Sequence, residues 1–476
     1  MKNIFIENKS LLKSDSKDKC ENSYKEILSY FLPEFITCFI LYFIINVLDS
    51  FFISKISSFC FANSGVIETL FHFITKTAEG FSVGLIILCG MFNGNSEYKK
   101  AGEIFSNSFW IFFIFGSIIS IVLYTNAYSI YSLYQLPKDI CNIGVPYLRL
   151  RAISVFFSFI FFSLIGFLRA IKNTKVPMII FIIGSLIFIF FDYVLIFGKL
   201  GFTQYGFNGS AIACIIHYVS MLIITLIYIL FDPNIKKYCI NWRPKFNNLN
   251  INYINDFINL SLPVIIDKAT FAIFYIWLSN RTSFISASYD TQTCTTLLSS
   301  FNTIKHIERL SILPAIALTQ VITFLVSNSI KSNDKTNKLI ILDHIKKVLI
   351  ISFFMVSSIL IFFAIWPKIF ISLFDQEGSF TINTANIIPI ISILVLFDMV
   401  QLILAAALRG AAQVKTVMWT RLIIGGLFFI PTSYILSIIS IKNLNIKFML
   451  IYSTFYISNV FMSIVYMKIL KNNYNN

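Results

Sequence analysis

Two segments of this chain share a residue pattern and lie 240 positions apart. Residues 168–178 read LRAIKNTKVPM, and residues 408–418 read LRGAAQVKTVM. Each copy ends one long apolar run and precedes another. A repeat of this kind divides a hydrophobic chain into two similar halves, an organisation that is typical of transporters whose halves move against each other.

The composition indicates that most of the chain lies in a lipid bilayer. Apolar residues make up 57% of the 476 positions, and charged residues make up only 13%. A soluble domain cannot bury that much apolar surface, because a globular core stops growing at a smaller chain length. A membrane span needs about 20 apolar residues, and the chain contains twelve such runs. They are roughly 32–54, 61–89, 104–126, 146–168, 176–198, 208–231, 257–280, 294–326, 347–367, 386–408, 414–438 and 447–467.

We therefore expect an all-α, polytopic membrane protein with 12 transmembrane helices in two pseudo-symmetric six-helix lobes. The polar stretch 232–256 reads as a cytoplasmic linker between an N-lobe at 32–231 and a C-lobe at 257–467. Residues 1–31 and 468–476 read as cytoplasmic tails. Because each lobe has an even number of spans, both lobes have the same orientation and form parallel repeats.

The net charge of +15 follows from membrane topology and gives no support to nucleic-acid binding. The N-terminus and every second loop together hold 24 of the 38 lysines and arginines, and the opposite loops hold six. Loops rich in lysine and arginine remain in the cytoplasm, so both termini are predicted to be cytoplasmic. Residues 1–31 have no cleavable signal pattern, and the composition favours a bacterial inner membrane.

Three carboxylates interrupt the apolar spans, namely Asp49, Asp192 and Asp398. An ionisable side chain at membrane depth is costly, and those that persist usually face a cavity or a partner. A buried carboxyl can exchange a proton for a sodium ion or a cationic substrate, which is what a cation-coupled pump requires. We interpret these three residues as candidate sites for a coupling cation.

The second and eighth spans each carry a stripe of charge. Glu68, His72, Lys76 and Glu79 fall on one helical face. The seventh span carries Asp267 and Lys268, and the eighth span carries Lys305, His306, Glu308 and Arg309. These groups either neutralise one another as buried pairs or line a wet path between the lobes. On the second interpretation, Glu68, His72, Lys76, Glu79, Asp267, Lys305 and Glu308 border the substrate path, and the cations indicate a substrate with polar or anionic groups.

Two arginines at the ends of spans and the cysteines have simpler interpretations. Arg169 and Arg409 end their spans at the predicted cytoplasmic edge, where lipid headgroups and the helix dipole favour a cation. The eight cysteines are scattered singly and show no metal-ligand spacing, so we expect neither a metal site nor a resident cofactor.

The sequence resembles the multidrug and toxic compound extrusion (MATE) transporters over nearly its whole length. The similarity is strongest from Tyr147 to Arg169, at 174–177, and from Asp192 through Gly198 to Ala213. It also includes the first span at 48–53, and residues 397–410 of the second lobe. The resemblance implies a cation-coupled antiporter that exports organic compounds by alternating access. It also implies that Asp49 and Asp192 form the N-lobe cation site and that Asp398 is the C-lobe acidic position.

The sequence departs from that family at two positions. Phe188 occupies a position where the family commonly has asparagine, one turn before Asp192. Phe271 occupies roughly the place of a seventh-helix glutamate found in one branch of the family. A phenylalanine offers no oxygen to a metal cation, so proton coupling tolerates the first departure better than sodium coupling.

Three functions fit these observations to different degrees. The first is a MATE-type antiporter that couples proton or sodium entry to export of a small molecule and acts as a monomer. The second keeps this architecture but carries a lipid-linked or anionic metabolite, which the membrane-depth cations favour. The third is an intramembrane enzyme, which the chain does not support because it lacks a nucleophile, metal-protease or Walker A motif.

Overall fold

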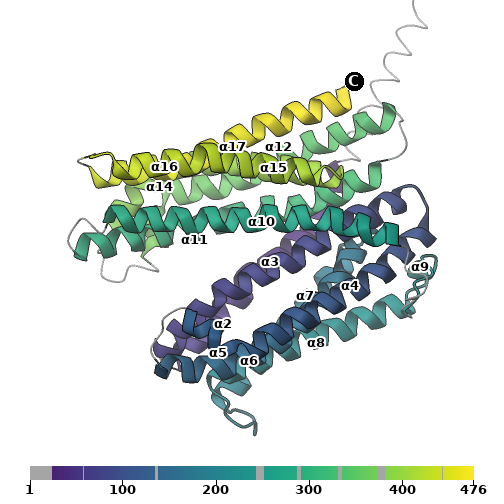
Figure 1. Ribbon diagram of the computed structural model, residues 1–476, viewed down its shortest axis with the longest axis horizontal. Helices are drawn as coiled ribbons and strands as arrows, with labels where there is room; N and C mark the ends of the chain where they lie inside the picture. The colour runs from purple at the N-terminus through teal and green to yellow at the C-terminus, as the bar shows by residue number, and fades with distance from the viewer. Residues whose placement is uncertain are drawn as a thin grey trace, which may run out of the picture.

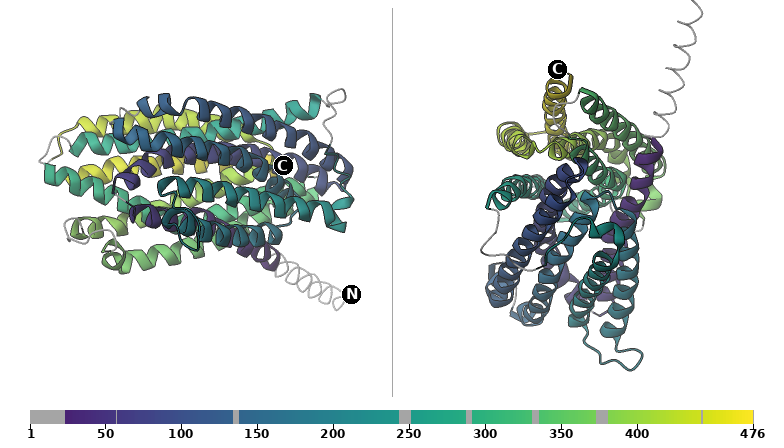
Figure 2. Two further views of the ribbon diagram at one scale, coloured as in Figure 1. Left: turned by 90° about the horizontal axis from the view of Figure 1, so that it is seen from below. Right: turned by 90° about the vertical axis from the view of Figure 1, so that its right-hand side faces the viewer.

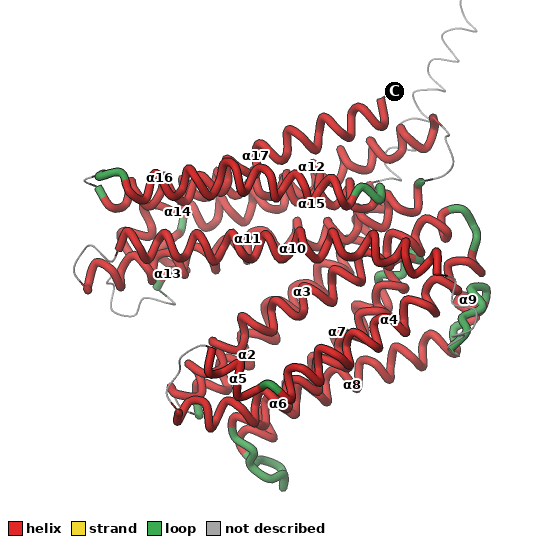
Figure 3. Tube along the Cα trace, in the orientation of Figure 1, coloured by secondary structure: helices red, strands yellow, loops and turns green. Residues whose placement is uncertain are grey.

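The computed structural model describes residues 24–56, 58–133, 138–242, 251–286, 291–330, 335–372, 381–441 and 443–475. Twelve helices in these ranges are long and apolar enough to cross a membrane, the first at Tyr24–Ser54 and the last at Leu444–Asn473. Helices and connecting loops account for the described chain, as Figure 3 shows. The predicted fold class is confirmed, and the protein is a multi-pass membrane protein with these twelve candidate spans in its described ranges.

Two groups of helices form the two lobes (Figures 1 and 2). In the N-lobe, a helix from Tyr24 passes through the π-helical turn η1 (Ile40–Ile44) into α2 (Ile45–Ser54). The remaining N-lobe helices are α3 (Ser58–Gly94), α4 (Tyr98–Thr125), α5 (Ala127–Leu133), α6 (Lys138–Ala170), α7 (Lys175–Phe197) and α8 (Phe207–Phe231). The short α9 (Pro233–Lys236) follows them.

The C-lobe contains α10 (Ile251–Ser286), α11 (Thr291–Ser329), α12 (Lys335–Ile365), α13 (Pro367–Ile371), α14 (Thr381–Gly410), α15 (Val414–Ile424), the π-helical turn η3 (Gly425–Phe429), α16 (Ile430–Ile438) and α17 (Leu444–Asn475). Helix α10 begins inside the stretch predicted as a linker. This helix extends beyond its apolar span, because helical hydrogen bonding continues past the point where the side chains turn polar.

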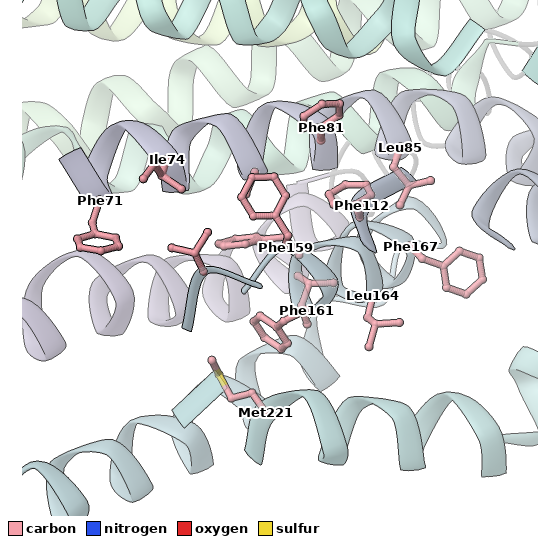
Figure 4. Close-up of a cluster of buried hydrophobic side chains, with 14 of the residues drawn as sticks. Phe71, Ile74, Phe81, Leu85, Phe112, Phe159, Phe161, Leu164, Phe167 and Met221 are labelled. Carbon is pink, nitrogen blue, oxygen red and sulfur yellow. The ribbon is translucent and has the colours of Figure 1, made fainter. Parts of the chain in front are cut away.

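Aromatic side chains fill the core of the N-lobe (Figure 4). Phe105 of α4 stacks on Phe167 of α6, with ring centroids 4.4 Å apart. Phe81 of α3 contacts the rings of Phe112 and Phe159. The many phenylalanines of the sequence therefore lie both on lipid-facing surfaces and between helices, where they hold α3, α4 and α6 together.

The repeated segments fold into the same turn in each lobe. Lys172 and Ala412 both adopt the left-handed conformation, each with φ of 61°. In both copies the residue after this position returns a hydrogen bond to the leucine carbonyl that opens the segment, over 2.9 Å. This is the Schellman arrangement that ends a helix and satisfies its last carbonyl groups. The sequence repeat is thus a repeat of backbone geometry.

The lobes meet along a row of glycines on the second half of α3. A Cβ atom at Gly84 would lie 2.0 Å from the Ser261 hydroxyl of α10, and one at Gly94 would lie 2.0 Å from the Asn328 carbonyl oxygen of α11. Small residues permit this close approach of helices in a membrane. The contact lies toward the end of the molecule that carries α9, called the α9 end below, while α2 and α5 lie at the other end (Figure 1).

A cross-linking experiment tests this closed contact. Asn93 donates a hydrogen bond to Asn328 across the lobes over 2.7 Å, so the double variant Asn93→Cys, Asn328→Cys is expected to form an inter-lobe disulfide on mild oxidation. Adding Gly94→Leu should reduce this cross-link, because the new side chain forces the two helices apart. Gel mobility in native membranes measures the cross-linked fraction.

The matched control is Gly426→Leu, since a Cβ atom at Gly426 meets nothing within 4 Å. It should leave the cross-linked fraction unchanged. Equal cross-linking in both leucine variants would contradict the glycine-mediated contact.

Candidate functional site

The first predicted carboxylate, Asp49, lies on α2 in the N-lobe. Its Oδ1 atom accepts a hydrogen bond from the Ser210 hydroxyl of α8 over 2.6 Å. Helix α2 also packs directly against α7, which carries Asp192. Helix α2 thus meets the consecutive helices α7 and α8 at this point, and the structure brings the two predicted N-lobe residues together.

Asp192 is fully buried on α7. Within the described part of the chain, neither of its carboxyl oxygens has a hydrogen-bond partner. Asp49 and Arg151 of α6 are both near enough to interact with it electrostatically. A buried carboxyl group without a partner is unusual in a folded protein, because a lost hydrogen bond is costly in a medium of low polarity.

One guanidinium group accompanies these two carboxyl groups. Arg151 lies over the ring of Phe71, with its Cζ atom 4.7 Å from the ring centroid. It also interacts electrostatically with Asp49. With both carboxyl groups ionised, this cluster carries one net negative charge at membrane depth, and one bound monovalent cation would cancel it.

Two aromatic side chains, Phe188 and His217, form what we call the aromatic wall, one turn from Asp192 along α7. Phe188 is buried one turn earlier on α7 and meets the His217 ring edge to face, with centroids 5.6 Å apart. The His217 Nδ1 atom lies 2.8 Å from the Gly184 carbonyl oxygen. This wall supplies no side-chain oxygen toward Asp192.

A second polar cluster lies between the lobes and is centred on Glu79 of α3. Lys268 of α10 donates to Glu79 Oε2 over 2.9 Å, and Lys76 donates to the same carboxylate over 3.0 Å. Tyr42 of η1 donates its hydroxyl proton to Glu79 Oε1. We call Tyr42, Lys76, Glu79 and Lys268 the inter-lobe cluster. It joins a π-helical turn and one helix of the N-lobe to the first helix of the C-lobe.

The other stripe residues have different surroundings. His72 is exposed and interacts electrostatically with Arg309 of α11 and with Lys268, both in the opposite lobe. Arg309 is also exposed, and Lys305 places its ammonium 5.1 Å from the Phe301 ring centroid. The side chain of Glu68 lies outside the part of the protein that the structure describes.

The C-lobe contains a buried network of four charged residues. Asp267 of α10 accepts hydrogen bonds from Arg409 of α14 and Arg421 of α15, each over 2.5 Å. Asp398 of α14 accepts a hydrogen bond from Asn459 of α17 over 3.0 Å and interacts electrostatically with Arg421. Two arginines are thus balanced by two carboxyl groups when Asp398 is ionised.

Glu308 of α11 lies inside the C-lobe rather than on a path between the lobes. It is 5% exposed and accepts a hydrogen bond from the Tyr456 hydroxyl of α17. Its Oε2 atom has no hydrogen-bond partner within the described residues. A small cavity adjoins it, lined by Ile304, Ile307, Leu360, Ile388, Ile391, Ser392 and Val395.

A sequence profile of the MatE family matches residues 35–194, the segment that contains Asp49, Lys76, Glu79 and Asp192. Over this segment, about a third of the chain, the protein is similar to the MatE family. Relatives at the level of sequence include a probable multidrug resistance protein YoeA of Bacillus subtilis, 24% identical over 36% of this chain and 38% of its own length. Another is a probable multidrug resistance protein NorM of Bacillus cereus, 25% identical over 64% of either chain. The chain thus spans between about a third and two thirds of these relatives' lengths.

Solved MATE structures share the fold over nearly the whole chain. A MATE transporter of Vibrio cholerae, VcmN, superimposes with a TM-score of 0.83 over 95% of this chain and 98% of its own, at 14% identity. A MOP superfamily transporter from Pyrococcus furiosus superimposes with a TM-score of 0.81 over 95% and 96%, at 17% identity. That protein is described as having a binding pocket of reverse polarity, which suggests a different function for it.

Sequence reasoning missed several groups of the site. Arg151 is one of them, because no periodicity in the sequence signals that it turns toward Asp49. Arg169 and Arg409 were expected to be membrane-edge anchors, but both form buried ion pairs, Arg169 with Glu34 over 2.7 Å and Arg409 with Asp267. Asp267 was expected to border the substrate path, and the structure places it in the C-lobe interior, since two arginines bind it there.

Proposed function

We propose that this protein is a MATE-type, cation-coupled antiporter that exports organic compounds by alternating access. Asp192 is the observation that carries this proposal, because its buried carboxyl group has no described partner and stands beside Asp49. A site that carries one net negative charge in the membrane is stabilised by binding one cation. Cation entry can therefore provide the free energy for the movement of the lobes.

We propose the proton as the coupling ion. Sodium is bound by several oxygen ligands, whereas the aromatic wall of Phe188 and His217 and the guanidinium of Arg151 offer none to Asp192. Protonation needs only the carboxyl group itself. Asp398 is proposed as a second coupling residue, since its protonation would change the charge balance with Arg421 in the C-lobe.

Alternating access fits the arrangement of the lobes. Helix α3 contacts α10 and α11 on its second half, and the exposed His72 lies on its first half. Movement of one lobe against the other would break the glycine contact and expose the inter-lobe cluster at the α9 end. The relatives named as multidrug resistance proteins support organic compounds as cargo. The lipid-linked or anionic cargo remains the second candidate, favoured by Lys76, Lys268 and Arg309.

We further propose that both termini are cytoplasmic, that the bacterial inner membrane is the location, and that the protein acts as a monomer without a resident cofactor. The bias of lysine and arginine between alternate loops supports the orientation. The small-molecule cargo and the lipid bilayer are then the partners that the function requires.

Transport in liposomes tests the proposed coupling. Purified protein is reconstituted, a proton gradient or a sodium gradient is imposed separately, and uptake of fluorescent organic compounds is followed, with one cationic and one anionic probe. We expect uptake driven by the proton gradient alone. Uptake that needs a sodium gradient would overturn the choice of ion, and equal uptake with and without any gradient would overturn coupling itself.

A further inference from the structure

We propose that the inter-lobe cluster, together with Arg309 and His72, is a binding site for a multiply charged organic anion, of which an organic phosphate is the simplest class. This inference rests on the proposed function, because it names the class of cargo that the exporter carries. It is drawn from the charges that face each other across the lobes.

The cations at this site outnumber the described carboxylates. Lys76 and Lys268 share the single carboxylate of Glu79, which leaves one positive charge without compensation. Arg309 adds a second positive charge and forms no ion pair within the described residues, which leave out the side chain of Glu68. A surplus of positive charge at membrane depth is unfavourable unless an anion is bound there for part of the transport cycle.

The cations come from both lobes and point into the space between them. Lys76 and His72 lie one turn apart on the same face of α3. Lys268 reaches them from α10 by its bond to Glu79, and Arg309 of α11 interacts electrostatically with His72. An anion bound here would therefore contact both lobes at once, which is the position that a transported substrate occupies.

Glu79 lies inside the candidate membrane span Leu70–Gly94. With a helical rise of 1.5 Å per residue, Glu79 lies about 22 Å from Gly94, where α3 ends at the α9 end of the molecule. Substrate sites of transporters built from two repeats are found near this depth, at the interface between the repeats. The half-buried Lys76 and Lys268 attract an anion more strongly than surface lysines do, because less water screens them.

Donors on the cations remain available for a ligand. An ammonium group has three N–H donors, and Lys268 donates to Glu79 alone among the described residues. Lys268 keeps 19% of its side chain exposed, and Arg309 is exposed as well. Both therefore have N–H donors that can reach a ligand oxygen.

Glu79 occupies the place that a ligand anion would take. It accepts from Tyr42, Lys76 and Lys268, so both of its oxygens are engaged. A phosphate that binds the two lysines must compete with this carboxylate. Removal of the Glu79 charge is therefore expected to strengthen anion binding, whereas removal of a lysine charge weakens it. This opposition in sign separates a binding role from a purely structural one.

Binding of methylumbelliferyl phosphate tests the proposal. Its fluorescence anisotropy is titrated with the purified full chain in detergent, and methylumbelliferone, which lacks the phosphate, is the matched ligand control. Lys268→Gln should weaken phosphate binding about tenfold or more, the value of one charge-assisted hydrogen bond. Glu79→Gln should strengthen it by a similar factor. Lys237→Gln, at an exposed lysine of the α9 end, should leave binding unchanged.

Competition with farnesyl phosphate distinguishes a lipid-linked phosphate from a water-soluble organic phosphate as the ligand. Displacement of the fluorescent probe would identify a lipid-linked phosphate as a ligand, and its absence would identify a water-soluble organic phosphate. Either outcome supports the anion site. If Lys268→Gln does not fold, Arg309→Gln replaces it, since Arg309 is exposed and forms no described ion pair.

Three results would overturn the proposal: no preference for the phosphate over methylumbelliferone, no effect of Lys268→Gln on affinity, or weaker binding in Glu79→Gln. The assay uses no gradient, so its outcome is independent of coupling. Asp192→Asn should lose coupled transport and keep phosphate binding, which distinguishes failure of the anion site from failure of the proposed function.

Discussion

Replacement of Asp267 by alanine is expected to lower the free energy of unfolding by about 3–5 kcal/mol, the usual cost of leaving a buried ion pair broken. Asp267 is 1% exposed and bonds both Arg409 and Arg421, which are 9% and 2% exposed. Without it, two guanidinium groups remain in the C-lobe interior with only Asp398 near Arg421 to compensate them. Unfolding of the detergent-solubilised protein, followed by tryptophan fluorescence, measures the loss.

Two variants control this measurement. Asp267→Asn keeps one oxygen acceptor but loses the charge, so its stability should fall between those of the native protein and the alanine variant. Glu97→Ala removes an exposed partner of Lys100 at the surface and should have a much smaller effect. The buried network would be excluded as a source of stability if Asp267→Ala unfolded like Glu97→Ala.

Asp192→Asn is expected to reduce proton-driven transport to the level of protein-free liposomes. Asparagine has nearly the same size and can fill the same space on α7, but it cannot gain or lose a proton. Because Asp192 has no described hydrogen-bond partner, the change should cost little stability. The loss should therefore appear in transport and not in the amount of folded protein.

The matched control for this variant is Asp256→Asn, which changes an exposed carboxyl group near the start of α10. It should transport like the native protein. Ser210→Ala removes the hydroxyl that bonds Asp49 and should weaken coupling without abolishing it. Native transport rates in Asp192→Asn would rule out the N-lobe pair as the coupling site.

The sequence was sufficient to predict the twelve helices and the two lobes. Apolar runs of membrane-spanning length can be read directly, because every backbone group in lipid must bond within its own helix. The repeat at 168–178 and 408–418 predicted the internal symmetry, and the structure confirms it in the shared turn at Lys172 and Ala412. Asp49, Asp192 and Asp398 also stood out as candidates, because a carboxylate within an apolar run is conspicuous.

Only the tertiary structure decided which charges meet. Lys268 pairs with Glu79 although 189 positions separate them, and Asp267, its neighbour in sequence, turns into the C-lobe toward Arg421. Adjacent residues on a helix point about 100° apart, so the packing of α10 between α3 and α15 determines what each one reaches. Composition and hydropathy place charges along the chain and across the membrane. The partner of each charge depends on how the helices pack, because ion pairs between helices join residues that are remote in the sequence.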